Sequence, residues 1–204
     1  MKHLALTAAL VSGIFISAPA QADVAAGLKA RDAQQWEVAL KEFGTDLKSE
    51  RTRFEANLRI GETLVMIGKS KDALEYLKAA VEENSEHADA QYWWGAANGE
   101  VAGEASIFSA AGYAKKCLKA FKKAVALAPA HLDAREGLMQ FYLEAPGFVG
   151  GDKDKALVQA NEILVRDSER GYLNLASVYR AQDKPAEALA AYDTLLAAHP
   201  ASTH

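Results

Sequence analysis

The sequence predicts an all-α protein, built as a right-handed α-solenoid of helix–turn–helix repeats. The dipeptide Ala-Leu occurs at 39–40, 73–74, 156–157 and 188–189, and each copy opens a helix-like apolar pattern. The first two copies are 34 residues apart, a period typical of helix–turn–helix arrays. No strand-like alternation competes with this pattern after residue 22. Because such arrays present extended surfaces to their partners, binding is favoured over catalysis.

Small side chains recur where the paired helices should cross. Gly27 and Gly61 precede Ala39 and Ala73 by twelve residues each. Only a small residue at such a place lets two helix backbones approach without a clash. Large residues alternate with the small ones and should fill the space between neighbouring helices, namely Leu64, Leu77, Tyr179 and Tyr192.

This alternation resembles the tetratricopeptide repeat (TPR) family over most of residues 23–204. The most specific match is carried by Tyr172, Leu175, Ala176, Tyr179, Ala188, Tyr192 and Pro200. The resemblance implies a TPR-like solenoid in which the first helix of each unit lines a concave groove. We expect one domain of about five units, at about 23–52, 54–87, 88–131, 132–168 and 169–202.

Two of these units are longer than the others. In the third unit, Gly95 and Cys117 hold the paired small positions but lie 22 residues apart, so about ten residues are inserted. We expect the segment 99–112 to form an ordered loop that reaches a second loop at 144–151. There, Pro146 and three glycines cannot continue a helix.

The first 22 residues have the pattern of a secretory signal peptide. A short positive region at Lys2 precedes an apolar stretch from Leu4 to Ser17, which is short for a bilayer span. A small-residue cleavage site ends at Ala22. We therefore predict cleavage near Ala22, a bacterial periplasmic or secreted location, and no transmembrane segment. The single cysteine excludes an intrachain disulfide.

No set of residues converges for catalysis. Cys117 replaces a small residue at a helix crossing, which favours a buried, inert thiol over a nucleophile. His87 and His131 recur at equivalent junctions between units, and this favours capping over metal binding. Asp152 follows two glycines and should cap the next helix rather than bind phosphate or calcium. We expect no catalytic residue, no metal and no cofactor.

A stripe of five lysines follows one face of a predicted helix, at Lys115, Lys116, Lys119, Lys122 and Lys123. It could meet anionic lipid headgroups or an acidic partner. A solvated outer face is favoured, because the opposite face belongs to the repeat core. With a formal net charge of −4 and no aromatic stacking motif near these lysines, nucleic acid is not an expected partner.

The TPR resemblance also implies which residues face the groove. In the fourth unit either Gln140 or Phe141 faces inward, because either Gly137 or Met139 can hold the small position. The resulting surface suits an extended peptide, or a helix with apolar anchors. The predicted partner contacts are Leu28, Arg31, Leu58, Glu62, Tyr92, Trp93, Phe141, Leu173 and Arg180.

Two functions remain open at this point. The first is a periplasmic adaptor that binds a protein or peptide of the cell envelope through the groove. The alternative is a small-ligand-binding accessory protein of an envelope uptake system, because the segment 141–151 resembles one found in TPR proteins of TRAP-type uptake systems. In that case the loops 99–112 and 144–151 would close a pocket lined by Tyr92, Trp93, Phe108, Phe141, Tyr142 and Phe148.

Overall fold

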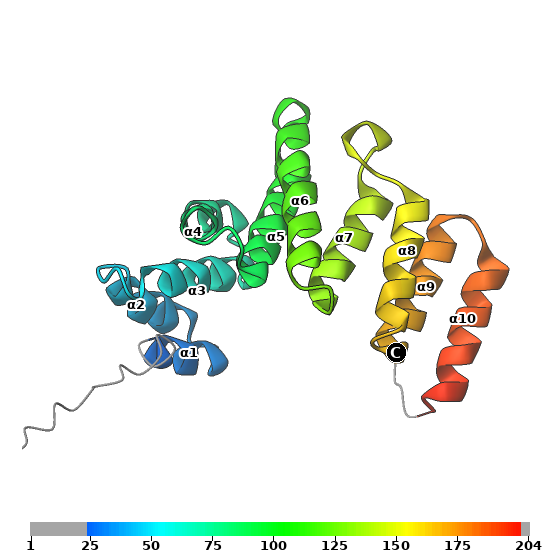
Figure 1. Ribbon diagram of the computed structural model, residues 1–204, viewed down its shortest axis with the longest axis horizontal. Helices are drawn as coiled ribbons and strands as arrows, with labels where there is room; N and C mark the ends of the chain where they lie inside the picture. Colours follow the sequence, from blue (N-terminus) through cyan, green and yellow to red (C-terminus); the bar gives the residue numbers. More distant parts are fainter. Residues whose placement is uncertain (1–23, 201–204) are drawn as a thin grey trace, which may run out of the picture.

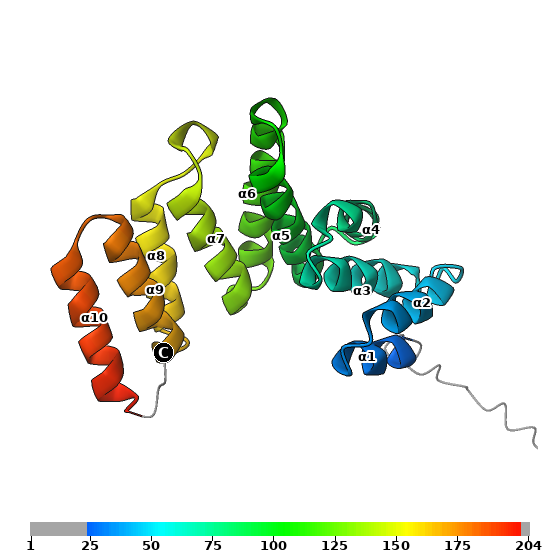
Figure 2. The ribbon, with the colours of Figure 1, turned by 180° about the vertical axis from the view of Figure 1, so that it is seen from behind.

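The computed structural model describes residues 24–200, and within this range every regular element is helical. Helices pair antiparallel and the pairs stack along a curved path, so the predicted all-α solenoid is confirmed (Figures 1 and 2). The predicted signal peptide and its cleavage site lie outside the described residues.

Each pair consists of a first and a second helix. The first helices are α1 (Ala25–Asp32), α3 (Arg53–Met66), α5 (Ala88–Glu104), α7 (Leu132–Glu144) and α9 (Ser168–Ala181). The second helices are α2 (Trp36–Asp46), α4 (Ser70–Glu83), α6 (Ile107–Leu127), α8 (Lys153–Leu164) and α10 (Pro185–Ala198). A 3-10 helix, η2 (Gly147–Val149), lies between α7 and α8.

The small residues lie where the sequence predicts close helix crossings. A Cβ atom on Gly27 would lie 2.3 Å from the ring of Phe43, and one on Gly61 would lie 2.3 Å from Leu77. The ring of Phe121 fits against both Gly95 and Gly137, at 2.7 Å from an added Cβ in each case. The glycines therefore allow a large side chain of the neighbouring helix to fill the crossing.

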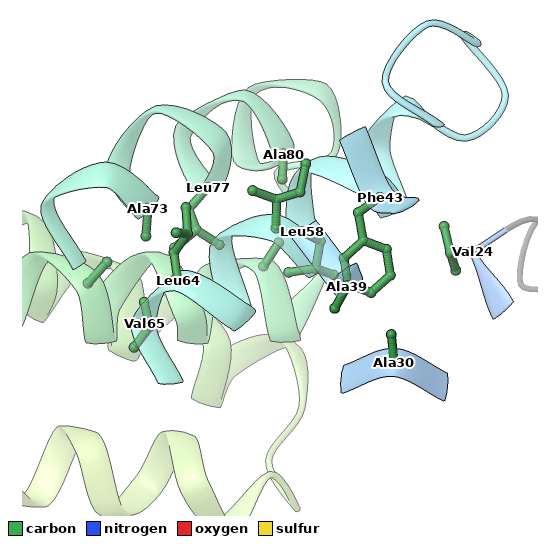
Figure 3. Close-up of a cluster of buried hydrophobic side chains, with 13 residues drawn as sticks. Val24, Ala30, Ala39, Phe43, Leu58, Leu64, Val65, Ala73, Leu77 and Ala80 are labelled. Atoms are coloured by element: carbon green, nitrogen blue, oxygen red, sulfur yellow. The ribbon is translucent and has the colours of Figure 1, made fainter. Parts of the chain in front are cut away.

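The buried side chains form two clusters along the solenoid. The first extends from Val24 to Ala97 and includes Phe43, Leu58 and Leu77 of the first two helix pairs (Figure 3). The second extends from Cys117 to Ala191. Each cluster is built from contacts between neighbouring helices, as expected for a repeat array.

The segment 99–112 is helical, and the prediction of a loop there was wrong. Helix α5 continues to Glu104 and α6 begins at Ile107, so the inserted residues lengthen both helices into a projecting hairpin (Figure 1). Ser106 precedes α6, and its carbonyl accepts hydrogen bonds from the Ser109 backbone N–H at 2.9 Å and the Ser109 hydroxyl at 3.2 Å. The insertion therefore leaves a turn of only two residues.

The second insertion forms the short loop at 145–152. Gly150 has φ of +116°, which favours glycine, and a Cβ there would lie 2.6 Å from Leu118 of α6. This loop therefore packs against α6 below the hairpin tip. The backbone N–H of Asp152 donates to the Tyr142 carbonyl at 2.8 Å, which fixes the loop to α7.

The predicted caps are present. Nδ1 of His87 accepts a hydrogen bond from the Ala90 N–H at 3.4 Å, and Nδ1 of His131 accepts one from the Ala134 N–H at 3.3 Å. The carboxylate of Asp152 accepts from two N–H groups in the first turn of α8, both at 3.1 Å. These contacts give hydrogen-bond acceptors to backbone N–H groups in the first turns of the helices, which have no partner within the helix.

The histidine caps also fix the register of the fourth unit. Gly95 follows His87 by eight residues, and Met139 follows His131 by eight. Met139 therefore occupies the small position, while Gly137 lies against the preceding unit. In this register Gln140 is exposed, whereas Phe141 is buried.

Candidate functional site

A cleft of about 880 Å³ lies between the α5–α6 hairpin and α7 with η2. We call it the hairpin cleft. Its apolar lining includes Tyr92, Ala96, Ala110, Ala111, Ala114, Cys117, Phe121, Met139, Phe141 and Val149. The turn of the hairpin and the α7–α8 loop project on the same side of the solenoid (Figures 1 and 2), and Ile107 and Phe148 at these two places line the cleft.

Small residues leave room for the cleft. On α5, Ala96, Gly99 and Gly103 line it at helical spacing, and on α6 the same role falls to Ala110, Ala114 and Cys117. Such side chains cannot fill the gap between the hairpin and α7. The insertion therefore creates a hollow because it lengthens the helices with small residues.

Large apolar side chains stand at the mouth. Ile107 is 84% exposed and Phe148 is 82% exposed, and both line the cleft. Phe108 is 96% exposed at the hairpin tip but does not line it. Large exposed apolar side chains gathered at one opening are typical of a binding site.

The polar lining is acidic. Four carboxylates line the described part of the cleft, and no lysine or arginine of residues 24–200 does so. Two of them, Asp133 and Glu136, are held by Arg170 of α9, with 2.6 Å between Arg170 Nη2 and Asp133 Oδ1. Asn174 also donates to Glu136, at 2.8 Å. The hydrogen bonds to Glu136 and Asp133, and the charges of both carboxylates, raise the pKa of the Arg170 guanidinium and keep it charged.

The other two carboxylates have only neutral partners among the described residues. Glu100 of α5 accepts a hydrogen bond from the Ser70 hydroxyl, and Glu144 of α7 accepts one from the Gln140 amide. Both glutamates are exposed. The cleft therefore carries negative charge that the described part of the chain does not neutralise.

The negative charge of the cleft affects the pKa of the Tyr92 hydroxyl. Burial raises the pKa of the Tyr92 hydroxyl, and the carboxylates of Asp133 and Glu136 raise it further. Arg170 opposes them without reversing the direction. Tyr92 therefore stays neutral at physiological pH and contributes an apolar ring to the cleft wall.

The structure brings together only some of the predicted contacts. Tyr92, Phe141 and Phe148 line the cleft, whereas Trp93, Phe108 and Tyr142 do not. Trp93 packs edge-on against the Tyr92 ring, with centroids 5.0 Å apart. Tyr142 is buried. Of the six residues expected to line a pocket, three therefore line the cleft and three do not.

The remaining predicted contacts lie elsewhere. Leu28 packs against the N-terminal cluster, and Leu58 is fully buried within it. Leu173 and Arg180 lie on α9 outside the cleft. Since the side chain of Leu58 has no exposed surface, it cannot contact a partner in this conformation.

Arg31 and Glu62, both predicted as groove contacts, are paired with each other at 2.8 Å. The other oxygen of Glu62 binds Arg59 at 2.7 Å. Burial alone would lower the pKa of Arg59, but its hydrogen bond to Glu62 and the charges of Glu55 and Glu62 raise it. Glu62 therefore links α1 to α3.

Glu62→Ala should lower the free energy of unfolding by about 2 kcal/mol, because it leaves two partly buried arginines without their shared carboxylate. Urea denaturation followed by circular dichroism measures this. Glu75→Ala is the control, since Glu75 is exposed on α4 and its loss should cost less than about 0.5 kcal/mol. Equal midpoints for the two variants would contradict a structural role for Glu62.

Cys117 lies at the floor of the cleft and is 2% exposed, so its expected burial is confirmed. Burial raises the pKa of its thiol to about 12, and the thiol is therefore neutral at pH 8. We expect a colorimetric disulfide reagent to react about a thousandfold more slowly with the native protein than with the guanidinium-unfolded chain. Similar rates in both states would show that the thiol is accessible.

Several residues of the site were missed by sequence analysis, chiefly Glu100, Ala110, Ala111, Glu144 and Asn174. The helical spacing of Ala110, Ala114 and Cys117 is the signal that was available. It indicates that α6 begins well before Cys117. Asn174 could not have been found in this way, because its approach depends on the curvature of the solenoid.

Other kinds of site find no support in the described chain. Within residues 24–200, no three His, Cys, Asp or Glu side chains gather as metal ligands would. Of the helices in this range, none combines the length and the apolarity that crossing a bilayer requires.

Known structures share this fold. TTC0263, a thermophilic TPR protein of Thermus thermophilus, aligns with a TM-score of 0.69 and 22% identity, over 90% of this chain and 93% of its own. MamA of Desulfovibrio magneticus RS-1 aligns with a TM-score of 0.70 and 16% identity, over 91% and 97%. YrrB, described as a TPR protein with an unusual peptide-binding site, gives 0.62 and 18%, over 86% and 84%.

These similarities establish a TPR fold, an architecture of stacked helical repeats. No protein-family model and no curated protein matches the sequence.

Proposed function

We propose that the protein is a periplasmic adaptor that binds a segment of another cell-envelope protein in the hairpin cleft. The observation that carries this proposal is the cleft itself, a hollow of about 880 Å³ with an apolar floor and exposed apolar residues at its mouth. A peptide-binding site in YrrB, which has a similar fold, supports a peptide as the ligand class. The signal-peptide pattern of residues 1–22 supports export.

Photo-crosslinking tests this function. A benzoylphenylalanine replaces Ala111, which lines the cleft, or Ala126, which is exposed on the same helix outside it. The full chain is expressed in a bacterium that exports it. We expect discrete protein adducts from position 111 and none from position 126. Identical adduct patterns at both positions, or none at either, would contradict the cleft as the binding site.

The location has its own test. Cell fractionation and N-terminal sequencing of the exported product should find the protein in the periplasm, beginning at Asp23. A product that stays in the cytoplasm with residues 1–22 attached would contradict the proposed location.

The volume of the cleft favours a second candidate, a small apolar ligand, because pockets for such ligands occupy roughly 300–1,000 Å³. In this case the protein would be an accessory component of an uptake system. Native mass spectrometry of the purified protein distinguishes the two candidates. A stoichiometric organic molecule, displaced by Ala111→Trp but not by Ala126→Trp, would favour the small ligand over the adaptor.

A further inference from the structure

We propose that the segment bound in the hairpin cleft is a basic amphipathic helix. Its apolar side chains would contact the floor around Phe121 and Phe141, and its lysines or arginines would contact Glu100 and Glu144. This inference rests on the proposed function, since it specifies the chemistry of the segment that occupies the same cleft.

The floor and the mouth of the cleft both require apolar side chains on the occupant. Phe121, Met139 and Phe141 form a floor without charge, so an occupant needs apolar side chains to displace water from it. Ile107 and Phe148 are almost fully exposed, and they become buried only if an apolar surface enters between them. An entirely polar segment would leave both unburied.

The charge of the occupant follows from the carboxylates. Glu100 lies on the hairpin wall and Glu144 on α7, and each accepts a hydrogen bond only from a neutral group among the described residues. A cation from an occupant would therefore be the first to pair with either of them. An acidic segment would meet like charge on both walls.

The lysine stripe of α6 does not neutralise these glutamates. Lys115, Lys116 and Lys119 are exposed and do not line the cleft. Lys123 pairs with Glu86 at 2.6 Å, away from the cleft. The positive and negative surfaces of the hairpin therefore lie on different faces.

The backbone requirements of the occupant favour a helix over an extended strand. An extended peptide leaves its N–H and C=O groups open and needs partners for them, as at a sheet edge. Most of the cleft wall is formed by helices, whose backbone groups bond internally, and the carbonyl of Pro146 in the α7–α8 loop already accepts from the N–H groups of Val149 and Gly151. The two amides in the lining, Gln140 and Asn174, already donate to Glu144 and Glu136. A helix satisfies its own backbone and presents only side chains.

Such a helix also matches the arrangement of charged and apolar side chains across the cleft. The two glutamates flank an apolar floor, and an amphipathic helix carries flanking charges beside its apolar stripe. A stripe bordered on both sides by lysine or arginine would place a cation toward each wall while apolar residues face Phe121.

Fluorescence anisotropy with two designed peptides tests this inference. Both are about 18 residues long, or five helical turns, with the same leucine and alanine stripe. One carries lysines beside the stripe and the other carries glutamates. At low salt we expect the lysine peptide to bind at least about tenfold more tightly, and added salt to weaken it.

Matched variants assign the effect to the cleft. Glu100→Gln with Glu144→Gln should weaken binding of the lysine peptide about tenfold, because each exposed ion pair contributes up to about fivefold. The control, Glu75→Gln with Glu187→Gln, removes the same charge from exposed positions on α4 and α10 and should bind like the parent protein. Circular dichroism confirms that both double variants are folded.

The outcomes separate this inference from the proposed function. Equal affinity for the two peptides, or equal loss in the two double variants, overturns the basic helix while Ala111 crosslinks still support the cleft. If Ala111→Trp leaves binding of the lysine peptide unchanged, the cleft is not the binding site. That result would overturn the proposed function and the inference together.

Discussion

Gly151→Ala should lower the free energy of unfolding by about 3 kcal/mol or more. A Cβ at this position would lie 1.7 Å from the carbonyl oxygen of Ala145, far inside contact distance. The loop has little freedom to relax, because the Gly151 N–H donates to the Pro146 carbonyl at 3.2 Å and the Asp152 N–H donates to the Tyr142 carbonyl at 2.8 Å. Thermal denaturation followed by circular dichroism measures the loss.

Gly147→Ala is the matched control in the same loop. No atom lies within 4 Å of a Cβ added there, and its φ is not in the left-handed range. We expect a change of less than about 0.5 kcal/mol. If the two variants have the same melting temperature, the close approach of Gly151 to Ala145 does not constrain the loop.

Gly171→Ala should have a similar effect at the other end of α8. An added Cβ would lie 2.2 Å from the Cα of Leu164, so the first turn of α9 and the last residue of α8 would have to separate. Asp167 caps α9 through the Arg170 N–H at 3.0 Å, and this holds the crossing in place. We expect a loss of about 3 kcal/mol in urea denaturation.

Gly112→Ala serves as the comparison for Gly171→Ala. Gly112 lies inside α6, is exposed, and has no atom within 4 Å of an added Cβ. Alanine has the higher helix propensity, so this variant should be unchanged or more stable by up to about 1 kcal/mol. A loss at position 112 equal to that at 171 would mean that a general effect of alanine, rather than the crossing, is responsible.

The parts of the fold that could be predicted depend on local rules. Gly61 lies twelve residues before Ala73 because two helices of one unit must cross closely, and this requirement is visible in sequence spacing. His87 and His131 likewise act within three residues of themselves. Such short-range constraints carry over directly from sequence to structure.

In the α5–α6 hairpin, amino-acid composition alone predicts the wrong secondary structure. Glycines at 99, 103 and 112 suggest a loop, but each lies within a helix. Glycine lowers helix propensity by about 1 kcal/mol, and packing of α5 along α6 offsets this cost. The helical spacing of the small residues is a better guide here than their type.

The candidate site depends on contacts that no local pattern specifies. Counting from Gly61 places Glu62 at the groove, but the pairing of Glu62 with Arg31 and Arg59 depends on how α1 meets α3. Likewise, Asp133 and Glu136 of α7 meet Arg170 only because α9 lies beside them. Long-range arrangement therefore decides which charges are available to a partner.

The division of the apolar interior into two clusters has a consequence for cooperativity. Glu62 belongs to helices of the first cluster, whereas Gly171 supports the second. In a linear array, each block can melt with its own midpoint when the coupling between blocks is weak. A change that destabilises one block would then unfold that block first. Helix α5 contributes Ala97 to the first cluster and α6 contributes Cys117 to the second, so the hairpin joins the two blocks, and unfolding of either one would remove a wall of the cleft.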